Sequence, residues 1–196
     1  MYDNTVIFIC ILFLFALSVI VIFFARQIIH FRKLSETDLM TQLLNYRGLL
    51  RNAEKLLKQN TPFSLAIIDI DNFRIFNMHS YTLGDAVLKE FALLLNANFL
   101  KDALIARFRL GDEFVIVFKN TELEKAKTEI RKFKEICVNY KFNSLVNCST
   151  HVISFSEGIV ELNSEINSEI NSIDSLFSEA EKSLKENKTQ KICANN

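Results

Sequence analysis

The chain has 196 residues, of which 49% are hydrophobic, and its 23 basic and 23 acidic residues give a formal net charge of +0. Because this balance provides no overall field that attracts nucleic acid, we expect no nucleic-acid partner. The four cysteines are scattered without a C-x-x-C pair, which argues against a zinc site and against a disulfide framework.

Residues 1–25 are expected to hold a short N-terminus and a transmembrane helix. From residue 6 onward they are almost all Val, Ile, Leu, Phe and Ala, and about 20 such residues span a bilayer. A cleaved signal peptide is the alternative, but it would need a basic start and a small-residue cleavage site. Arg26, Arg32 and Lys33 follow the apolar run, so the positive-inside rule predicts a single-pass protein of the inner (cytoplasmic) membrane with its C-terminal part in the cytoplasm.

Residues 26–37 are expected to continue this helix as a juxtamembrane stalk. Apolar side chains in the stalk could form a seam that faces a partner helix, or the stretch could be a plain linker. The seam residues are Ile28, Ile29, Phe31 and Leu34. Residues 35–38 offer N-cap candidates for a new helix.

Hydrophobic periodicity then predicts alternating helices and strands. We expect helices at residues 49–59, 73–78, 86–99, 122–138 and 173–188, and strands from residue 63, within 105–118 and at 149–162. Residues 163–172 repeat Asn-Ser-Glu-Ile and are expected to be a surface loop without chemistry. The alternation predicts an α/β (α+β) domain in which helices cover a partly antiparallel sheet.

Residues 105–118 read IARFRLGDEFVIVF and are expected to form a β-hairpin. The two ends are rich in β-branched and aromatic residues, whereas Gly111 and Asp112 form a turn pair. Asp112 and Glu113 therefore lie at the tip of the hairpin and at the start of its second strand. Because unpaired buried acids are costly, carboxylates at such a rim are usually solvated or bound to a cation.

A second acidic pair follows the apolar strand that begins near residue 63. Asp69 and Asp71 alternate at the end of this strand. If both strand ends meet, their carboxylates form a plausible Mg²⁺ site that phosphates complete. Two ordinary acidic loops would give the same sequence pattern, so this alternative stays open.

Four motifs, in order, resemble the GGDEF domain of diguanylate cyclases. Residues 38–47 are similar to the family's D-x-L-T-G-L-x-N-R-R, with Gln42 in place of glycine. Residues 69–74 are similar to D-I-D-x-F-K, and residues 111–114 match the end of the name motif. Residues 180–188 resemble the closing A-D-x-A-L-Y-x-A-K.

The resemblance covers roughly residues 35–192, and we place the domain at 38–192 with a tail at 193–196. It implies a nucleotide-cyclase-like fold, with a central mixed sheet of about five strands flanked by helices. It also implies that two GTP molecules are joined into cyclic di-GMP with the help of Mg²⁺ (or Mn²⁺). Each subunit would hold one GTP, in a homodimer or in a heterodimer with another cyclase-like domain.

The resemblance assigns roles to individual residues around the metal. Asp69 falls on the family's metal carboxylate, Ile70 on the position that lends a backbone carbonyl, and Glu113 on the second metal carboxylate. Asp112 falls on the acid beside it, near the reacting hydroxyl. Asp112 and Glu113 are therefore the candidate catalytic residues.

Further positions are implied to bind the substrate. Asn77 and Asp85 fall on the pair that reads the guanine edge. Arg74 replaces a lysine that faces phosphates, and Lys188 falls on a late phosphate-binding lysine. Gly111 is the glycine that remains of the phosphate-approaching turn.

The chain also departs from the family pattern. The name motif has one glycine where the family has two: either Leu110 occupies the first glycine position with a residue lost nearby, or the turn is otherwise rebuilt. The segment from Asn77 to Asp85 is one residue shorter than in the family. The arginine expected after the late lysine is Ile192, and the family's inhibitory R-x-x-D element is absent from residues 101–104. These departures predict a weakened cyclase, or a degenerate domain that binds nucleotide or protein without turnover. The apolar seam of the stalk offers a third hypothesis, a membrane-tethered partner for another cyclase.

Overall fold

The computed structural model describes residues 4–99, 103–109, 111–146, 148, 152–162 and 172–194. The chain divides into two compact units, one covering residues 1–36 and the other residues 37–196. The first unit consists of one long helix, α1 (Asn4–Glu36). Within α1, the stretch Val6–Phe31 is long and apolar enough to cross a membrane by length and composition, and none of its most apolar window is buried.

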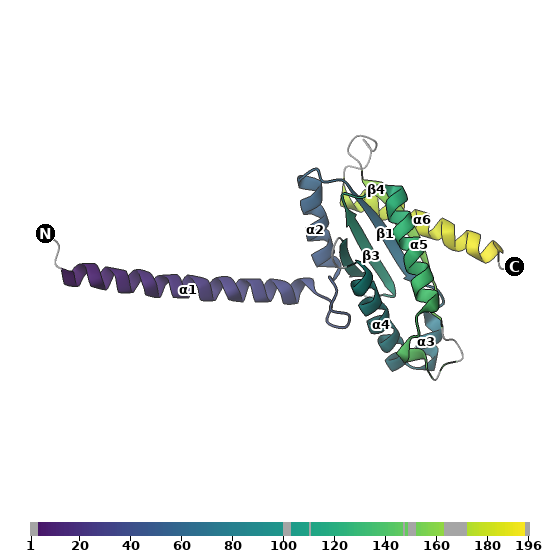
Figure 1. The fold of residues 1–196 in the computed structure, drawn as a ribbon, viewed down its shortest axis with the longest axis horizontal. Coiled ribbons are helices and arrows are strands. Elements are labelled where there is room, and N and C mark those ends of the chain that lie inside the picture. Colours follow the sequence, from purple (N-terminus) through teal and green to yellow (C-terminus); the bar gives the residue numbers. More distant parts are fainter. Residues whose placement is uncertain are drawn as a thin grey trace. The chain divides into compact units, whose positions relative to one another are not determined.

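The second unit is an α/β domain, whose elements alternate along the chain (Figure 1). Its helices are α2 (Tyr46–Lys58), α3 (Arg74–His79), α4 (Tyr81–Phe99), α5 (Leu123–Asn139), the 3₁₀ turn η1 (Asn143–Leu145) and α6 (Ile173–Ala194). Its strands are β1 (Phe63–Ile70), β2 (Ala103–Phe108), β3 (Glu113–Lys119) and β4 (Phe155–Leu162).

The described strands form one sheet with the order β2-β3-β1-β4, and all three pairings are antiparallel. β2 and β3 form the predicted hairpin. One isolated parallel bridge, between Leu44 and Ala106, adds to the β2 edge. The predicted fold class is confirmed; a fifth strand is not among the residues that the structure describes.

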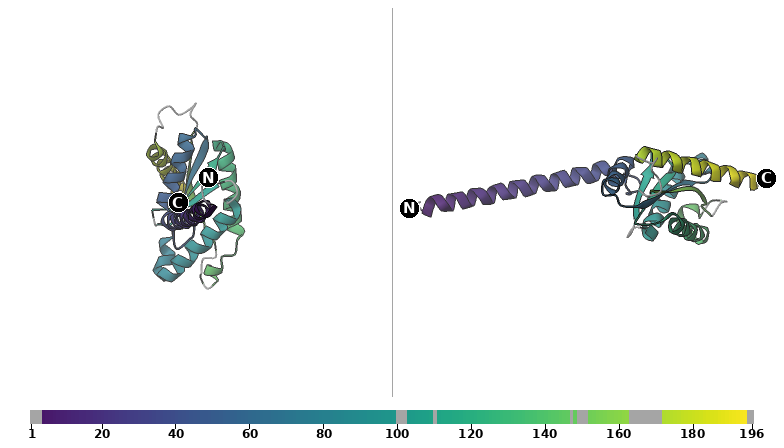
Figure 2. Two further views of the ribbon diagram at one scale, coloured as in Figure 1. Left: turned by 90° about the vertical axis from the view of Figure 1, so that its left-hand side faces the viewer. Right: turned by 90° about the horizontal axis from the view of Figure 1, so that it is seen from above.

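Helices cover both faces of this sheet, as Figures 1 and 2 show for α5 and α6 on opposite sides. Alternate residues of each strand face opposite sides, so β1 contributes Ala66 and Ile68 to the core under α4 and α5. It contributes Leu65 and Ile67 to the core under α2 and α6. By the same alternation, Asp69 faces the α6 side.

The helix α6 approaches the edge strand β4 very closely at Gly158. A β-carbon added there would lie 2.0 Å from the Ala180 carbonyl oxygen and 2.4 Å from the Leu184 backbone nitrogen. Only glycine permits this approach without displacing α6. The contact fixes how far the side chains of α6 reach over the sheet.

Two predicted helix starts are wrong, the one at residues 35–38 and the one at residue 49. No helix starts at residues 35–38; α1 ends at Glu36, and Asp38 instead closes a turn by accepting from the Thr41 backbone nitrogen at 2.8 Å. The next helix starts at Tyr46, capped by the Asn45 side chain, which accepts from the Gly48 backbone nitrogen at 2.9 Å. The predicted surface loop at 163–172 lies outside the described residues except for Ser172, and so do residues 149–151 of the strand predicted at 149–162. That strand begins later than predicted, at Phe155.

Candidate functional site

The site is built on a pair of carboxylates from two neighbouring strands. Asp69, near the end of β1, is the direct cross-strand partner of Glu113, the first residue of β3. Direct partners place their side chains on the same face with β-carbons about 5 Å apart. Ile70 follows at the end of β1, and its backbone nitrogen donates to the Asp112 carbonyl oxygen at 3.4 Å.

This cluster is rich in negative charge. Burial raises the pKa of the Glu113 carboxyl, and the charges of Asp69, Asp112 and Glu181 raise it further. Burial also raises the pKa of the Asp112 carboxyl, with Asp69 adding to the effect. Such a group of carboxylates is stabilised by a cation placed between them.

The nearest cations come from one face of α6. Lys188 Nζ lies 2.7 Å from Asp69 Oδ1, and Lys191 Nζ lies 2.5 Å from Asp71 Oδ2. The two lysines are three residues apart, so they lie on the same side of the helix. α6 therefore aligns two positive side chains along the end of β1.

The partners of the Asp71 carboxylate are hydrogen-bond donors of the protein. Ser154 Oγ and Ser156 Oγ each donate to it at 2.7 Å. Burial works against its ionisation, but the hydrogen bonds from Lys191, Ser156 and Ser154 lower the pKa of its carboxyl. Together with Asp69 and Lys188, these residues line an open hollow with a volume of ≈ 330 Å³.

Four residues of this hollow have no role predicted from the sequence: Asn72, Ser154, Ser156 and Lys191. The spacing of Lys191 from Lys188 on one helix face was the available signal. The serines carry no signal of their own, because only the pairing of β4 with β1 brings Ser156 opposite Asp69.

The donors at this site fit a hard divalent cation. The carboxylates of Asp69 and Glu113 and the carbonyl of Ile70 are oxygen ligands, and Mg²⁺ is typically held by one or two carboxylates, with water and phosphate oxygens supplying the rest. No group of three or more His, Cys, Asp or Glu residues with metal-binding geometry occurs in the described part of the chain.

Arg107 fixes the hairpin beside this cluster. Its Nε donates to the Gly111 carbonyl oxygen at 2.9 Å, while its Nη1 lies 3.5 Å from Asp38 Oδ1 and donates to Met40 Sδ at 3.3 Å. Burial opposes ionisation of Asp38, but hydrogen bonds from Thr41 and the charge of Arg107 lower the pKa of its carboxyl. Arg107 thus connects the motif at residues 38–47 to the hairpin turn.

The turn itself is formed without a glycine in the left-handed region. Gly111 has no positive φ, and a β-carbon added to it would meet nothing closer than 3.8 Å. Arg109 instead takes φ 47°, and its Nη1 lies 3.0 Å from Glu181 Oε1. Leu110 lies outside the described residues, so its effect on phosphate approach stays a prediction.

The residues expected to read the guanine lie on α3 and α4. Asn77 is half-buried and packs against α4, since a β-carbon added at Gly84 would lie 2.0 Å from Asn77 Oδ1. Asp85 and Arg74 are exposed. Among the described residues, no hydrogen bond or ion pair joins any of these three side chains to Asp69 or Glu113, and their roles stay predictions.

Comparisons with known proteins agree on one family. The family model described as "Diguanylate cyclase, GGDEF domain" matches residues 35–192. The response regulator PleD of Caulobacter vibrioides is 37% identical over 102 residues, which are 50% of this chain and 22% of that protein. A diguanylate cyclase of Vibrio cholerae is 37% identical over 101 residues, which are 48% of this chain and 30% of that protein. The matches thus span only a fifth to a third of these relatives.

Solved structures show the same fold. The coiled coil and GGDEF domain of DgcB from Caulobacter crescentus, in complex with c-di-GMP, gives a TM-score of 0.72 at 22% identity and covers 90% of this chain and 93% of that chain. The GGDEF domain of FimX from Pseudomonas aeruginosa gives a TM-score of 0.69 at 20% identity and covers 79% and 94%.

Proposed function

Because the chain belongs to the GGDEF domain family of diguanylate cyclases, we propose that it is a membrane-anchored cyclase that joins two GTP molecules into cyclic di-GMP and releases pyrophosphate, at a rate below that of relatives with the intact motif. The observation that carries this proposal is the cross-strand pairing of Asp69 with Glu113, beside Lys188. The pairing brings two carboxylates together at one end of the sheet, and the ion pair of Lys188 with Asp69 adds a cation that would bind phosphate in this proposal.

The donor set defines where a divalent cation would be held. Asp69, Glu113 and the carbonyl of Ile70 are its ligands in this proposal. The chemistry that Mg²⁺ (or Mn²⁺) would supply there is neutralisation of negative charge on the phosphates, which lowers the cost of phosphoryl-type transfer. Burial, together with the charges of Asp69, Asp112 and Glu181, raises the pKa of the Glu113 carboxyl, and a bound cation would offset the repulsion between these charges.

The remaining side chains position the two reactants. Lys188 and Lys191 exchange their carboxylate partners for triphosphate oxygens, and Lys191 supplies a charge that Ile192 does not. Arg74 contacts phosphate from α3. Asp112 lies near the 3′-hydroxyl of one nucleotide as it attacks the α-phosphate of the other. Positioning of this kind provides much of the rate acceleration in phosphoryl transfer.

Base recognition belongs to Asn77 and Asp85, whose carbonyl and carboxylate oxygens accept from the guanine edge in this proposal. Gly111 leaves space for phosphate at the turn. Each site holds one GTP, so the reaction needs two domains facing each other, as a homodimer or as a heterodimer with a related domain. α1 holds the domain at the inner membrane, with residues 37–196 in the cytoplasm.

The test is a turnover assay on the full chain purified in detergent micelles. With GTP and Mg²⁺ or Mn²⁺, the wild-type chain is expected to form cyclic di-GMP. Glu113→Gln removes one metal carboxylate and should lower the rate about a hundredfold or more. Lys132→Gln, an exposed change on α5, is the matched control and should retain the rate. Wild-type product no greater than that of Glu113→Gln would refute the proposal.

A catalytically inactive nucleotide-binding or protein-interaction domain is the second candidate. It is favoured by the tight packing of Asn77 against Gly84, which restricts the amide that would read guanine. In that case GTP would raise the thermal unfolding midpoint, or leave it unchanged, without any product forming. The same assay, run with a thermal unfolding measurement, distinguishes the two candidates.

A further inference from the structure

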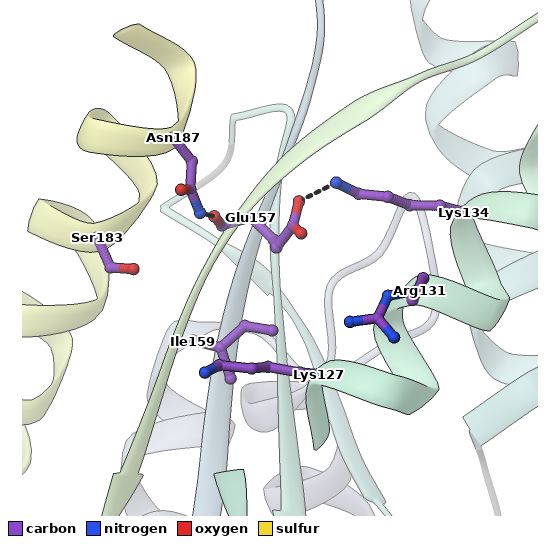
Figure 3. A pocket seen from close by; sticks show the side chains of 7 residues that line it. All are labelled: Lys127, Arg131, Lys134, Glu157, Ile159, Ser183 and Asn187. Atoms are coloured by element: carbon purple, nitrogen blue, oxygen red, sulfur yellow. Dashed lines mark hydrogen bonds and ion pairs between the residues drawn. The ribbon is translucent and has the colours of Figure 1, made fainter. Parts of the chain in front are cut away.

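A second hollow lies at the open edge of the sheet, between α5 and α6 (Figure 3). It has a volume of ≈ 270 Å³, and we call it the edge pocket. Its polar lining consists of Lys127, Arg131, Lys134, Glu157, Ser183 and Asn187. None of these residues belongs to the site described above.

Three cations enter the edge pocket from a single helix. Lys127, Arg131 and Lys134 are four and three residues apart on α5, so they share one face of the helix. Figure 3 shows the Arg131 guanidinium and the Lys127 side chain extending from α5 toward β4. Three positive groups are thereby directed at one short stretch of strand.

The structure neutralises these charges only in part. Lys134 pairs with Glu157, the one acid that lines the pocket. Lys127 Nζ lies 2.7 Å from Glu124 Oε1, in an exposed pair of the kind that contributes little. Arg131 has neither a hydrogen bond nor an ion pair with any residue that the structure describes. The lining therefore keeps a positive excess of two charges.

Neutral donors face the same space. Figure 3 shows the Ser183 hydroxyl pointing from α6 toward β4. Among the described strands, β4 pairs only with β1, so its outer edge is open. Asn187 Nδ2 donates to the Glu157 carbonyl oxygen on this edge at 2.7 Å, and the Glu157 N–H points to the same side because both groups of a strand residue share a direction.

We propose that the edge pocket binds a phosphate group of a small anion. A guanidinium fork, ammonium groups, a hydroxyl and a strand N–H are the donors that recognise phosphate oxygens. The volume lies just below the range of about 300–1,000 Å³ that is usual for drug-sized ligands, so the pocket suits a phosphate or small phosphomonoester rather than a dinucleotide. Glu157 faces the α5 side of the sheet, whereas Asp69 faces the α6 side, so this site is separate from the proposed GTP site and does not depend on it.

The experiment titrates inorganic phosphate, without divalent metal and at constant ionic strength, into the full chain in detergent micelles. Amide hydrogen exchange should slow in residues 127–134 and 157–159. Arg131→Gln should weaken the apparent affinity about tenfold or more, because a charge-assisted donor is lost. Glu157→Gln should tighten it severalfold, because it releases Lys134 and removes the opposing charge.

Two matched variants make the result decisive. Lys132→Gln removes the same charge from an adjacent exposed position on α5, and Lys188→Gln removes a cation from the proposed GTP site; both should leave phosphate binding within twofold of wild type. Arg131→Lys should bind with intermediate affinity. Phosphate that protects neither segment, or that binds Arg131→Gln as tightly as wild type, would overturn the proposal. Equal weakening by Lys132→Gln would show a general charge effect and would overturn it as well.

Discussion

Gln42 has a backbone conformation that is unfavourable for any residue with a β-carbon. Its φ is 60°, in the left-handed region, because the chain reverses between Asp38 and Leu43. Two backbone bonds close this turn: Gln42 N donates to Asp38 O at 2.9 Å, and Asp38 N donates to Leu43 O at 2.8 Å. This conformation costs an L-residue about 1 kcal/mol of conformational free energy relative to glycine.

Gln42→Gly is therefore expected to stabilise the domain. The relief of strain outweighs the loss of the exposed bond from Gln42 Nε2 to the Leu39 carbonyl oxygen. We expect a net gain of about 0.5–1 kcal/mol, which raises the thermal unfolding midpoint by about 2–3 °C. Circular dichroism of the full chain in detergent measures it. Gln42→Ala loses the same bond without relieving the strain, so a gain in this control would contradict the explanation.

The sequence indicates this residue only through the family motif, where a glycine is expected. It does not indicate that Arg109 also takes a left-handed φ, 47°, in a turn where Gly111 needs none. Local strain of this kind depends on which strand pairs with which. The positions of Asp69 and Glu113 could be predicted from their strand-end patterns, but their mutual distance could not, because register is a tertiary property.

At the scale of elements, hydrophobic periodicity predicts the helices and the central hairpin well. The helix predicted at 122–138 is observed as Leu123–Asn139, and the hairpin tip lies where Gly111 and Asp112 suggested. α6 extends to Ala194, beyond the predicted end at residue 188, because its polar last turns carry little periodic signal. Those turns carry Lys191, and its ion pair with Asp71 depends on the packing of α6 against β4.

Gly158→Ala tests whether the contact between α6 and β4 sets the site. The added methyl group would overlap Ala180 and Leu184, so α6 must move outward. We expect a loss of about 1–3 kcal/mol in the free energy of unfolding, typical of overpacking. Because Lys188 would move away from Asp69, turnover should fall as well.

The control for this change is Gly111→Ala. A β-carbon at Gly111 would meet nothing closer than 3.8 Å, so the variant should keep its thermal unfolding midpoint within about 1 °C. Thermal unfolding of both variants, run side by side, measures the difference. Equal stability of the two would mean that α6 adjusts freely and does not position the site.

At the scale of the whole molecule, the two units have different roles. Residues 37–196 contain both hydrophobic cores, one on each face of the sheet, whereas α1 exposes its apolar side chains along its length. We therefore expect the domain to fold without α1. In the proposed reaction, however, two domains must meet, and tethering to a membrane or to each other raises their effective concentration.

Removing residues 1–36 is thus expected to leave the thermal unfolding midpoint of the domain within about 2 °C, while turnover per chain falls about tenfold or more at nanomolar protein. The rate of this soluble variant should rise with the square of its concentration, because product then requires encounter of two monomers. Fusing a dimeric leucine zipper in place of α1 should restore the rate.

Sedimentation of the same variants provides a readout independent of catalysis: the deleted form should be monomeric and the zipper form dimeric. A deleted form that turns over as fast per chain as the full protein, at every concentration, would contradict the role given to α1.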